Sequence, residues 1–204
     1  MCLTVAGGVT DNFFSGLNSF RPNFTFLVDR PYGKALLTIQ EDWINNGFFT
    51  PAYSRVIMDS TIAQTIGGTQ STTFSELQLN KGTAGQTVSL LRPTLIDTSL
   101  ILTQGSLLMN TQTLTMNNPA LSGGTILAPT GPFTRTNGFL ISENAAATVI
   151  WKIIIHLGYR LVPFGSEVAA PVYIPFSTQL TGGTLGDLSV STYKAVGNLP
   201  CLPE

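Results

Sequence analysis

The only histidine of the chain, His156, is the one imidazole that could act as a general base or bind a metal. Alternation along the apolar run 151–157 places it on the same strand face as Lys152, opposite Trp151. A histidine beside a lysine on the less apolar face is expected to be solvated. No G-x-S-x-G motif accompanies it, so the sequence predicts no serine hydrolase centre.

The acidic residues are spread along the chain, and only Glu41 and Asp42 are adjacent. Enzymes that cleave polysaccharides need two carboxyl groups that converge on one bond. Adjacent strand residues point to opposite faces, so we expect these two to be solvated turn charges. The sequence also lacks a calcium-loop pattern and the Cys/His spacing of a zinc site. It therefore predicts no catalytic residue, no metal and no cofactor.

Four aromatic residues lie close together in the sequence: Trp43, Phe48, Phe49 and Tyr53. Aromatic rings can stack on sugar rings, so these residues are the candidate glycan-binding positions of the chain. The alternative is that Trp43 and one phenylalanine fill the protein interior, which is the commoner use of large aromatic side chains.

The composition favours an all-β protein with an uncharged surface. Charged residues make up 10% of the 204 residues, against about 25% in ordinary soluble domains. Threonine, serine and glycine supply the polarity instead, and such residues suit strands and turns better than helices. A formal net charge of −1 gives no attraction for nucleic acid or an anionic membrane, so neither is a predicted partner.

The chain ends carry few signals. Cys2 and Cys201 lie at opposite ends, and two separate thiols are preferred here to a disulfide between them. Residues 1–10 lack the basic and apolar regions of a signal peptide. No stretch approaches the roughly 18 apolar residues that span a bilayer, so no transmembrane segment is predicted.

Short apolar-alternating runs separated by turn residues are the main structural signal. From residue 35 they predict strands at 35–39, 43–44, 55–58, 63–66, 74–79, 87–91, 94–96, 99–102, 106–109 and 113–116. Between them stand turn formers such as Asn45-Asn46-Gly47 and Gly67-Gly68.

Repetition favours a β-solenoid over a β-sandwich. The strings Ser99-Leu-Ile-Leu-Thr, Gly105-Ser-Leu-Leu-Met and Gln112-Thr-Leu-Thr-Met are variants of one unit, as expected of stacked coils that bury their apolar sides against their neighbours. We therefore predict a parallel β-helix over 35–128, with about four coils of about 20–24 residues. Residues 1–34 show no repeat and are predicted as an unassigned segment or cap.

After Pro129 the expected strands are longer and more aromatic, at 139–142, 148–157, 159–164, 172–180 and 185–193. Turn pairs such as Asn137-Gly138 and Gly182-Gly183 separate them, which suits antiparallel hairpins. Residues 129–204 are predicted to form an antiparallel, sandwich-like module that could be incomplete at its end.

Four segments in order carry a resemblance to a known group of proteins. They are Trp43-Ile-Asn-Asn-Gly-Phe-Phe-Thr-Pro, Ala63-Gln-Thr-Ile-Gly-Gly-Thr, Thr73-Phe-Ser-Glu-Leu-Gln-Leu-Asn and Leu114-Thr-Met-Asn-Asn-Pro. Together they resemble the repetitive β-helical regions of large secreted surface proteins of Bacteroidetes-type bacteria. The resemblance covers roughly residues 35–200, and residues 1–34 depart from it.

The resemblance implies an extracellular or cell-surface location, typically reached by type IX secretion, and a chain that is part of a longer protein. Its neighbouring domains, other surface proteins and glycans are the implied partners. The expected function is that of a non-enzymatic structural or adhesive module. A carbohydrate-binding module is the alternative, followed by a β-helical enzyme that degrades polysaccharides.

Overall fold

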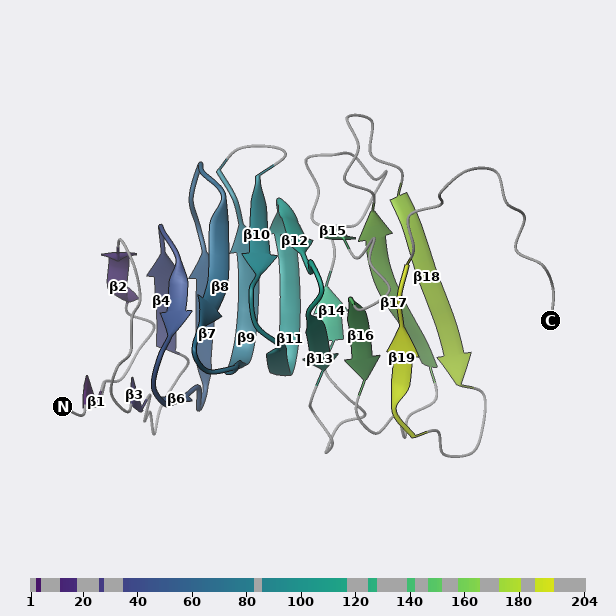
Figure 1. Cartoon of the computed structure of the whole chain (residues 1–204), viewed down its shortest axis with the longest axis horizontal. Coiled ribbons are helices and arrows are strands. Elements are labelled where there is room, and N and C mark those ends of the chain that lie inside the picture. Colours follow the sequence, from purple (N-terminus) through teal and green to yellow (C-terminus); the bar gives the residue numbers. More distant parts are fainter. Residues whose placement is uncertain are drawn as a thin grey trace.

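The computed structural model describes residues 3–4, 12–17, 26–27, 35–82, 86–116, 125–127, 139–141, 147–151, 158–165, 173–180 and 186–192. All regular secondary structure in these residues is β-strand, which confirms the all-β prediction (Figure 1). The strands, in chain order, are β1 (Leu3–Thr4), β2 (Asn12–Leu17), β3 (Phe26–Leu27), β4 (Ala35–Ile39), β5 (Trp43–Asn45), β6 (Phe49–Thr50), β7 (Ser54–Met58), β8 (Gln64–Gly68), β9 (Thr72–Asn80), β10 (Thr87–Leu90), β11 (Thr94–Gln104), β12 (Ser106–Leu108), β13 (Thr113–Met116), β14 (Thr125–Leu127), β15 (Phe139–Ile141), β16 (Thr148–Trp151), β17 (Gly158–Gly165), β18 (Tyr173–Leu180) and β19 (Leu188–Val190).

Most strands pair in parallel with the equivalent strand of the preceding coil. In one series β4 pairs with β7, β7 with β9 and β9 with β11. In a second series β5 pairs with β8, β8 with β10 and β10 with β12. A backbone that winds repeatedly in one direction produces this pattern, which is that of a parallel β-solenoid, here of about 4 turns.

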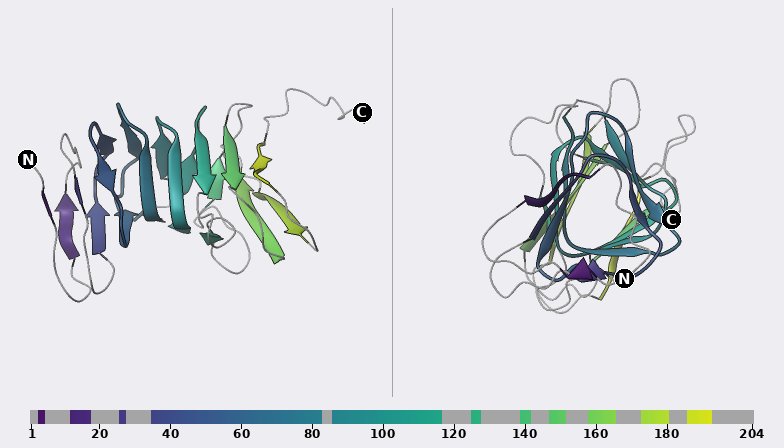
Figure 2. Two further views of the ribbon diagram at one scale, coloured as in Figure 1. Left: turned by 90° about the horizontal axis from the view of Figure 1, so that it is seen from below. Right: turned by 90° about the vertical axis from the view of Figure 1, so that its left-hand side faces the viewer.

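Each coil has three faces, and Figure 2 shows them end-on as a closed, roughly triangular ring. Face A contains β4, β7 and the C-terminal halves of β9 and β11. Face B contains β5, β8, β10 and β12. Face C contains β6, which contacts β9, together with the N-terminal halves of β9 and β11 and all of β13. The turn that joins face A to face B is named the A–B corner below.

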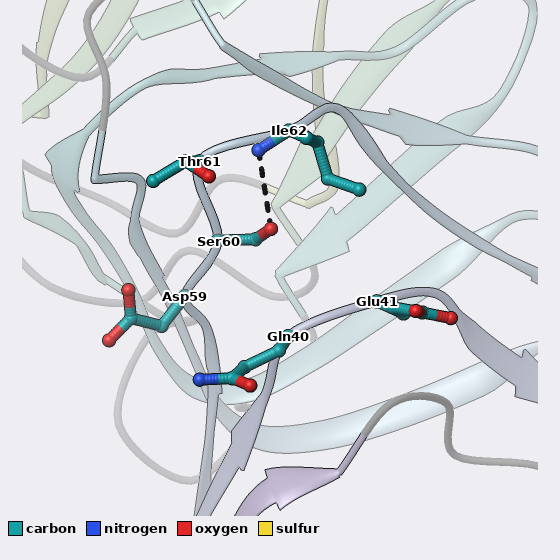
Figure 3. Close-up of a pocket in the computed structure, with 6 residues that line it drawn as sticks. All are labelled: Gln40, Glu41, Asp59, Ser60, Thr61 and Ile62. Carbon is teal, nitrogen blue, oxygen red and sulfur yellow. Dashed lines mark hydrogen bonds between the residues drawn. The ribbon is translucent and has the colours of Figure 1, made fainter.

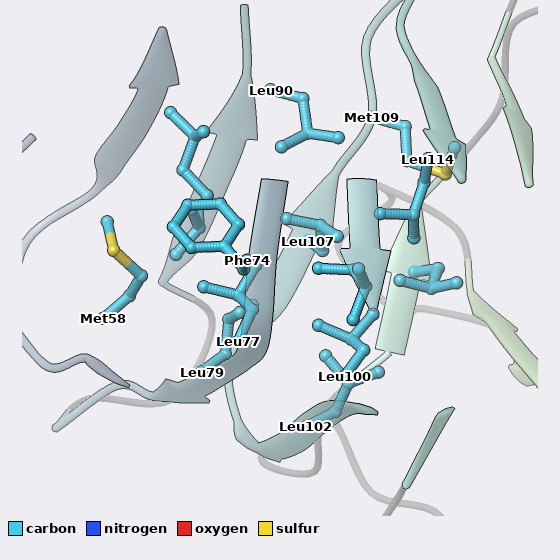
Figure 4. Close-up of a cluster of buried hydrophobic side chains, with 14 of the residues drawn as sticks. Met58, Phe74, Leu77, Leu79, Leu90, Leu100, Leu102, Leu107, Met109 and Leu114 are labelled. Atoms are coloured by element: carbon cyan, nitrogen blue, oxygen red, sulfur yellow. The ribbon is translucent and has the colours of Figure 1, made fainter. Parts of the chain in front are cut away.

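The core fills the interior of the ring. Burial alternates residue by residue along β4 and β7, because successive strand side chains point to opposite faces of a sheet. The parallel register places apolar side chains of successive coils next to one another: Val56 lies beside Leu77, and Leu77 beside Leu100. Figure 4 shows part of this stack. Full burial of each such side chain stabilises the fold by about 1.5–3 kcal/mol.

The prediction of a parallel solenoid in the central part of the chain is confirmed. The predicted strands 35–39 and 113–116 are β4 and β13 residue for residue. The expected strands 94–96 and 99–102 form one continuous strand, β11, whose pairing with β9 shifts register between Ile96 and Ser99. The chain therefore passes from face C to face A through an irregularity without leaving the sheet.

The sandwich-like module expected after residue 128 is not shown. β15 pairs in parallel with β12, and β16 with β13, so both strands continue the existing stacks. β17 also pairs in parallel with β15. Within the described residues, antiparallel pairing is limited to β18 on β17 and β19 on β16. The exposed edge of a parallel sheet accepts a strand of either direction, so hairpin-like turn signals need not mark a separate domain.

The ends of the predicted segments are described only in part. In residues 1–34, β2 pairs in parallel with β4, and β1, β3 and β6 form a three-stranded parallel sheet. The predicted boundary at 128–129 lies outside the described residues, so it stays a prediction.

Candidate functional site

The four candidate aromatic residues do not share one surface. Trp43 is 0% exposed and packs edge-to-face on two core rings, with centroid distances of 4.8 Å to Phe49 and 5.0 Å to Phe74. Its indole Nε1 donates a hydrogen bond to Thr72 Oγ1 at 3.0 Å. Phe49 is partly buried against the same core. Trp43 therefore offers no ring face to a ligand.

Phe48 and Tyr53 are the two candidates that face solvent. Their side chains are 75% and 71% exposed, and they flank β6 at the two ends of face C in one coil. Tyr53 follows Ala52, whose φ of 40° belongs to the left-handed region. The tight turn at Ala52 thus presents Tyr53 outward, while the backbone carbonyl of Tyr53 accepts a hydrogen bond from Ala35 N at 3.0 Å.

A polar pocket lies at the A–B corner, between the turn after β4 and the turn after β7. It has a volume of about 380 Å³ and is lined by Gln40, Glu41, Asp59, Ser60, Thr61 and Ile62. Figure 3 shows the carboxylates of Glu41 and Asp59 at opposite ends of this pocket.

Backbone hydrogen bonds hold the pocket walls in place. Asp59 N donates to Ile39 O at 2.9 Å, and Gly82 N donates to Ser60 O at 3.0 Å, so the turn after β7 is fastened to the coils on both sides. Within the turn, Ile62 N donates to Ser60 Oγ at 3.2 Å. The pocket is therefore shaped by the fold before any ligand arrives.

Two buried polar side chains lie behind this corner. Gln64 Nε2 donates to Ile39 O at 3.1 Å and also to Glu41 O, while Gln64 Oε1 accepts from Lys81 Nζ. Lys81 is fully buried. Burial lowers the pKa of Lys81 from 10.5 to about 8, and the charge of Asp59 opposes that shift.

Other polar side chains also link one coil to the next. On the outside of face A, Arg55 Nε donates to Glu76 Oε2 at 2.6 Å, and Gln78 Nε2 donates to Thr103 Oγ1 at 3.0 Å. In the turn that joins face B to face C, Asn110 Nδ2 donates to Leu90 O at 2.9 Å. These bonds join residues 20 to 25 positions apart, which is about one coil.

Several sequence-derived candidates lie outside the described residues: His156, Cys2 and Cys201. Glu41 and Asp42 take different roles, since Glu41 lines the pocket while Asp42 Oδ1 accepts a hydrogen bond from Thr65 N at 2.7 Å. In the described part of the chain, no three His, Cys, Asp or Glu side chains are placed to hold a metal ion. None of the described residues belongs to a helix that could cross a membrane.

Sequence reasoning missed the pocket and the buried lysine behind it. Lys81-Gly82 has the composition of a turn, and a lysine in a turn is expected in solvent. Gln64 carried no signal beyond its place in a strand. Only the spacing between repeats could have shown that both lie at one corner of neighbouring coils.

Comparison of the chain with known protein families, with curated proteins and with solved structures finds no match.

Proposed function

We propose that this chain is a non-enzymatic structural or adhesive module of a larger bacterial surface or secreted protein. One observation supports the structural part most directly: several interior polar side chains form hydrogen bonds between one coil and another. Asn45 Nδ2, for example, donates to Ser71 O at 3.0 Å and to Thr72 Oγ1 at 3.2 Å. A rod stiffened in this way suits a stalk or a display platform.

The extracellular location and the type IX route rest on the resemblance of the four segments that begin at Trp43. The low charge content, 10% of residues, agrees with that assignment without requiring it. Protease treatment of intact cells of the source bacterium tests the location. We expect the chain to be degraded while a cytoplasmic marker survives, and protection of the chain in intact cells would contradict the proposal.

The non-enzymatic part rests on the sequence, in which the acidic residues are scattered and only Glu41 and Asp42 are adjacent. Its test is the release of reducing ends or unsaturated sugars from a panel of polysaccharides. We expect no release above a buffer control. Cleavage that disappears in Glu41→Gln or Asp59→Asn would show that the pocket is catalytic after all.

A second candidate function is glycan binding, and the exposure of Phe48 and Tyr53 favours it. Aromatic rings that face solvent are available to stack on the apolar faces of sugar rings. A printed array of bacterial, plant and host oligosaccharides tests this function. Binding lost in Phe48→Ala or Tyr53→Ala would support it, while Thr69→Ala, at an exposed position of the next coil, serves as the control.

A further inference from the structure

We infer that the pocket at the A–B corner binds a neutral sugar unit of a glycan. The inference rests on the second proposed function, glycan binding, and assigns it a site distinct from the exposed aromatic residues. Three features of the described residues carry it: the shape of the corner, the set of polar groups that line it, and the hydrogen bonds that hold its backbone.

The pocket arises because two neighbouring turns differ in length. Residues 40–42 join β4 to β5, whereas the longer segment 59–63 joins β7 to β8, although β4 and β7 pair in register along their whole length. Residues of both turns line the pocket. A volume of about 380 Å³ is at the lower end of small-ligand pockets and is suited to one sugar ring.

The lining side chains keep their polar groups available. Several interior polar side chains of the described solenoid, among them Asn45 and Gln64, are engaged in hydrogen bonds between coils. By contrast, the Glu41 and Asp59 carboxylates, the Gln40 amide and the Thr61 hydroxyl make no hydrogen bond within the described part of the chain. Ile62, with 58% of its surface exposed, adds one apolar contact at the rim.

This set of groups selects among ligand classes. Two carboxylates and no cationic side chain line the pocket, so an anionic ligand is repelled. A bound metal ion needs oxygen ligands that converge, but the carboxylates stand at opposite ends (Figure 3). Separated acceptors, a hydroxyl and an amide match a ligand that carries several hydroxyl donors around a ring. A neutral sugar has that chemistry.

The backbone behind the pocket is held rigidly, which lowers the entropic cost of binding. Gln64 Nε2 holds the carbonyl groups of Ile39 and Glu41, and Lys81 holds Gln64 in turn. Glu41 is thereby anchored through its main chain while its side chain is left exposed to a ligand.

The test uses the same oligosaccharide array, followed by calorimetric titration with the neutral oligosaccharide that gives the strongest signal. We expect Asp59→Ala and Glu41→Ala each to weaken binding at least tenfold, with circular dichroism unchanged. Asp42→Asn is the matched control: it removes a neighbouring negative charge outside the pocket but keeps the Oδ1 that accepts from Thr65 N. It should bind as the unaltered chain does.

The possible outcomes distinguish an error in the assigned binding site from an error in the proposed glycan-binding function. If no oligosaccharide binds, glycan binding itself is wrong, and the pocket proposal falls with it. If binding survives both pocket variants but is lost in Phe48→Ala or Tyr53→Ala, glycan binding stands and the pocket proposal alone is overturned. Preference for sulfated or uronic-acid oligosaccharides over neutral ones would also overturn it.

Discussion

Lys81 donates a hydrogen bond from its Nζ to Oε1 of Gln64 inside the solenoid, where both side chains are buried. The two residues belong to successive coils, and Gln64 reaches on to the Ile39 and Glu41 carbonyls of the coil before. One polar chain thus spans three coils through a largely apolar interior. Buried polar groups are costly unless they are hydrogen-bonded, so each member depends on the next.

Replacing Gln64 by leucine removes the middle of this chain. Lys81 then keeps a buried amine without its acceptor, and the Glu41 carbonyl loses the Gln64 donor. The Ile39 carbonyl keeps only the hydrogen bond from Asp59 N. We expect the free energy of unfolding to fall by about 3 kcal/mol, because a buried group left without its hydrogen-bond partner costs about 1–3 kcal/mol, and more when it is charged. Urea titration measures the change. The control is Gln70→Leu, the same substitution at an exposed position, which should leave stability within about 0.5 kcal/mol.

The stability of the protein should rise with pH above 8. Burial lowers the pKa of Lys81 to about 8 in the folded chain, against 10.5 when unfolded. Between these values the unfolded chain binds the proton that the folded chain has lost, so the free energy of unfolding increases with pH, by at most about 3 kcal/mol. Urea titrations at pH 7.5 and 9.5 measure the rise. It should be absent in Lys81→Met, and an equal rise in that variant would refute the assignment to Lys81.

Gly105→Ala should destabilise the fold, because Gly105 has a φ of 86°. An added Cβ would overlap Lys81 Cγ and lie 2.9 Å from Gln86 O. Backbone strain and overpacking together should lower the free energy of unfolding by about 2–3 kcal/mol, as measured by thermal or urea unfolding. Gly186→Ala is the matched control, since no atom lies within 4 Å of the point that its new Cβ would occupy. Equal stability of the two variants would contradict the close approach at Gly105.

Thr72→Val tests the hydrogen bonds around the buried tryptophan. Thr72 Oγ1 accepts from Trp43 Nε1 at 3.0 Å and from Asn45 Nδ2 at 3.2 Å. Valine has nearly the same shape but no acceptor, so we expect a loss of about 1–3 kcal/mol in the free energy of unfolding. Thr69→Val, at an exposed position, should be nearly neutral. If both variants unfold at the same urea concentration, the buried bonds contribute nothing measurable.

Much of the fold follows from alternation in the sequence. The run at 113–116 alternates polar and apolar residues, and the run at 35–39 is apolar apart from Thr38; both are strands with the predicted bounds. The direction of pairing is harder to derive, because a strand shows the same alternation in parallel and antiparallel sheets. Internal repetition indicated the direction correctly where the repeat is clear, before residue 117. After it, the turn signals were right only in part, because β18 and β19 pair antiparallel while β15 and β16 join in parallel.

The candidate site was less predictable, because it depends on which turns are neighbours in space. Trp43 and Phe48 look alike as exposed aromatic candidates in the sequence, yet one is 0% and the other 75% exposed. The alternation of side chains along β5 determines the burial of Trp43. Phe48 lies in a turn, where side chains follow no such alternation. The pocket needs Glu41 and Asp59 to meet across two coils, and only the register of β4 on β7 shows this.

The unequal turns of the A–B corner have a consequence for how such a protein can change. The connection is a single residue, Gly105, between β11 and β12, but spans 59–63 between β7 and β8, while the strands on either side remain in parallel register. Insertions at this corner therefore leave the stacked interior intact. Foreign peptides grafted between residues 59 and 63 would be displayed on a fixed scaffold, and lineages could acquire new recognition loops there without rebuilding the core.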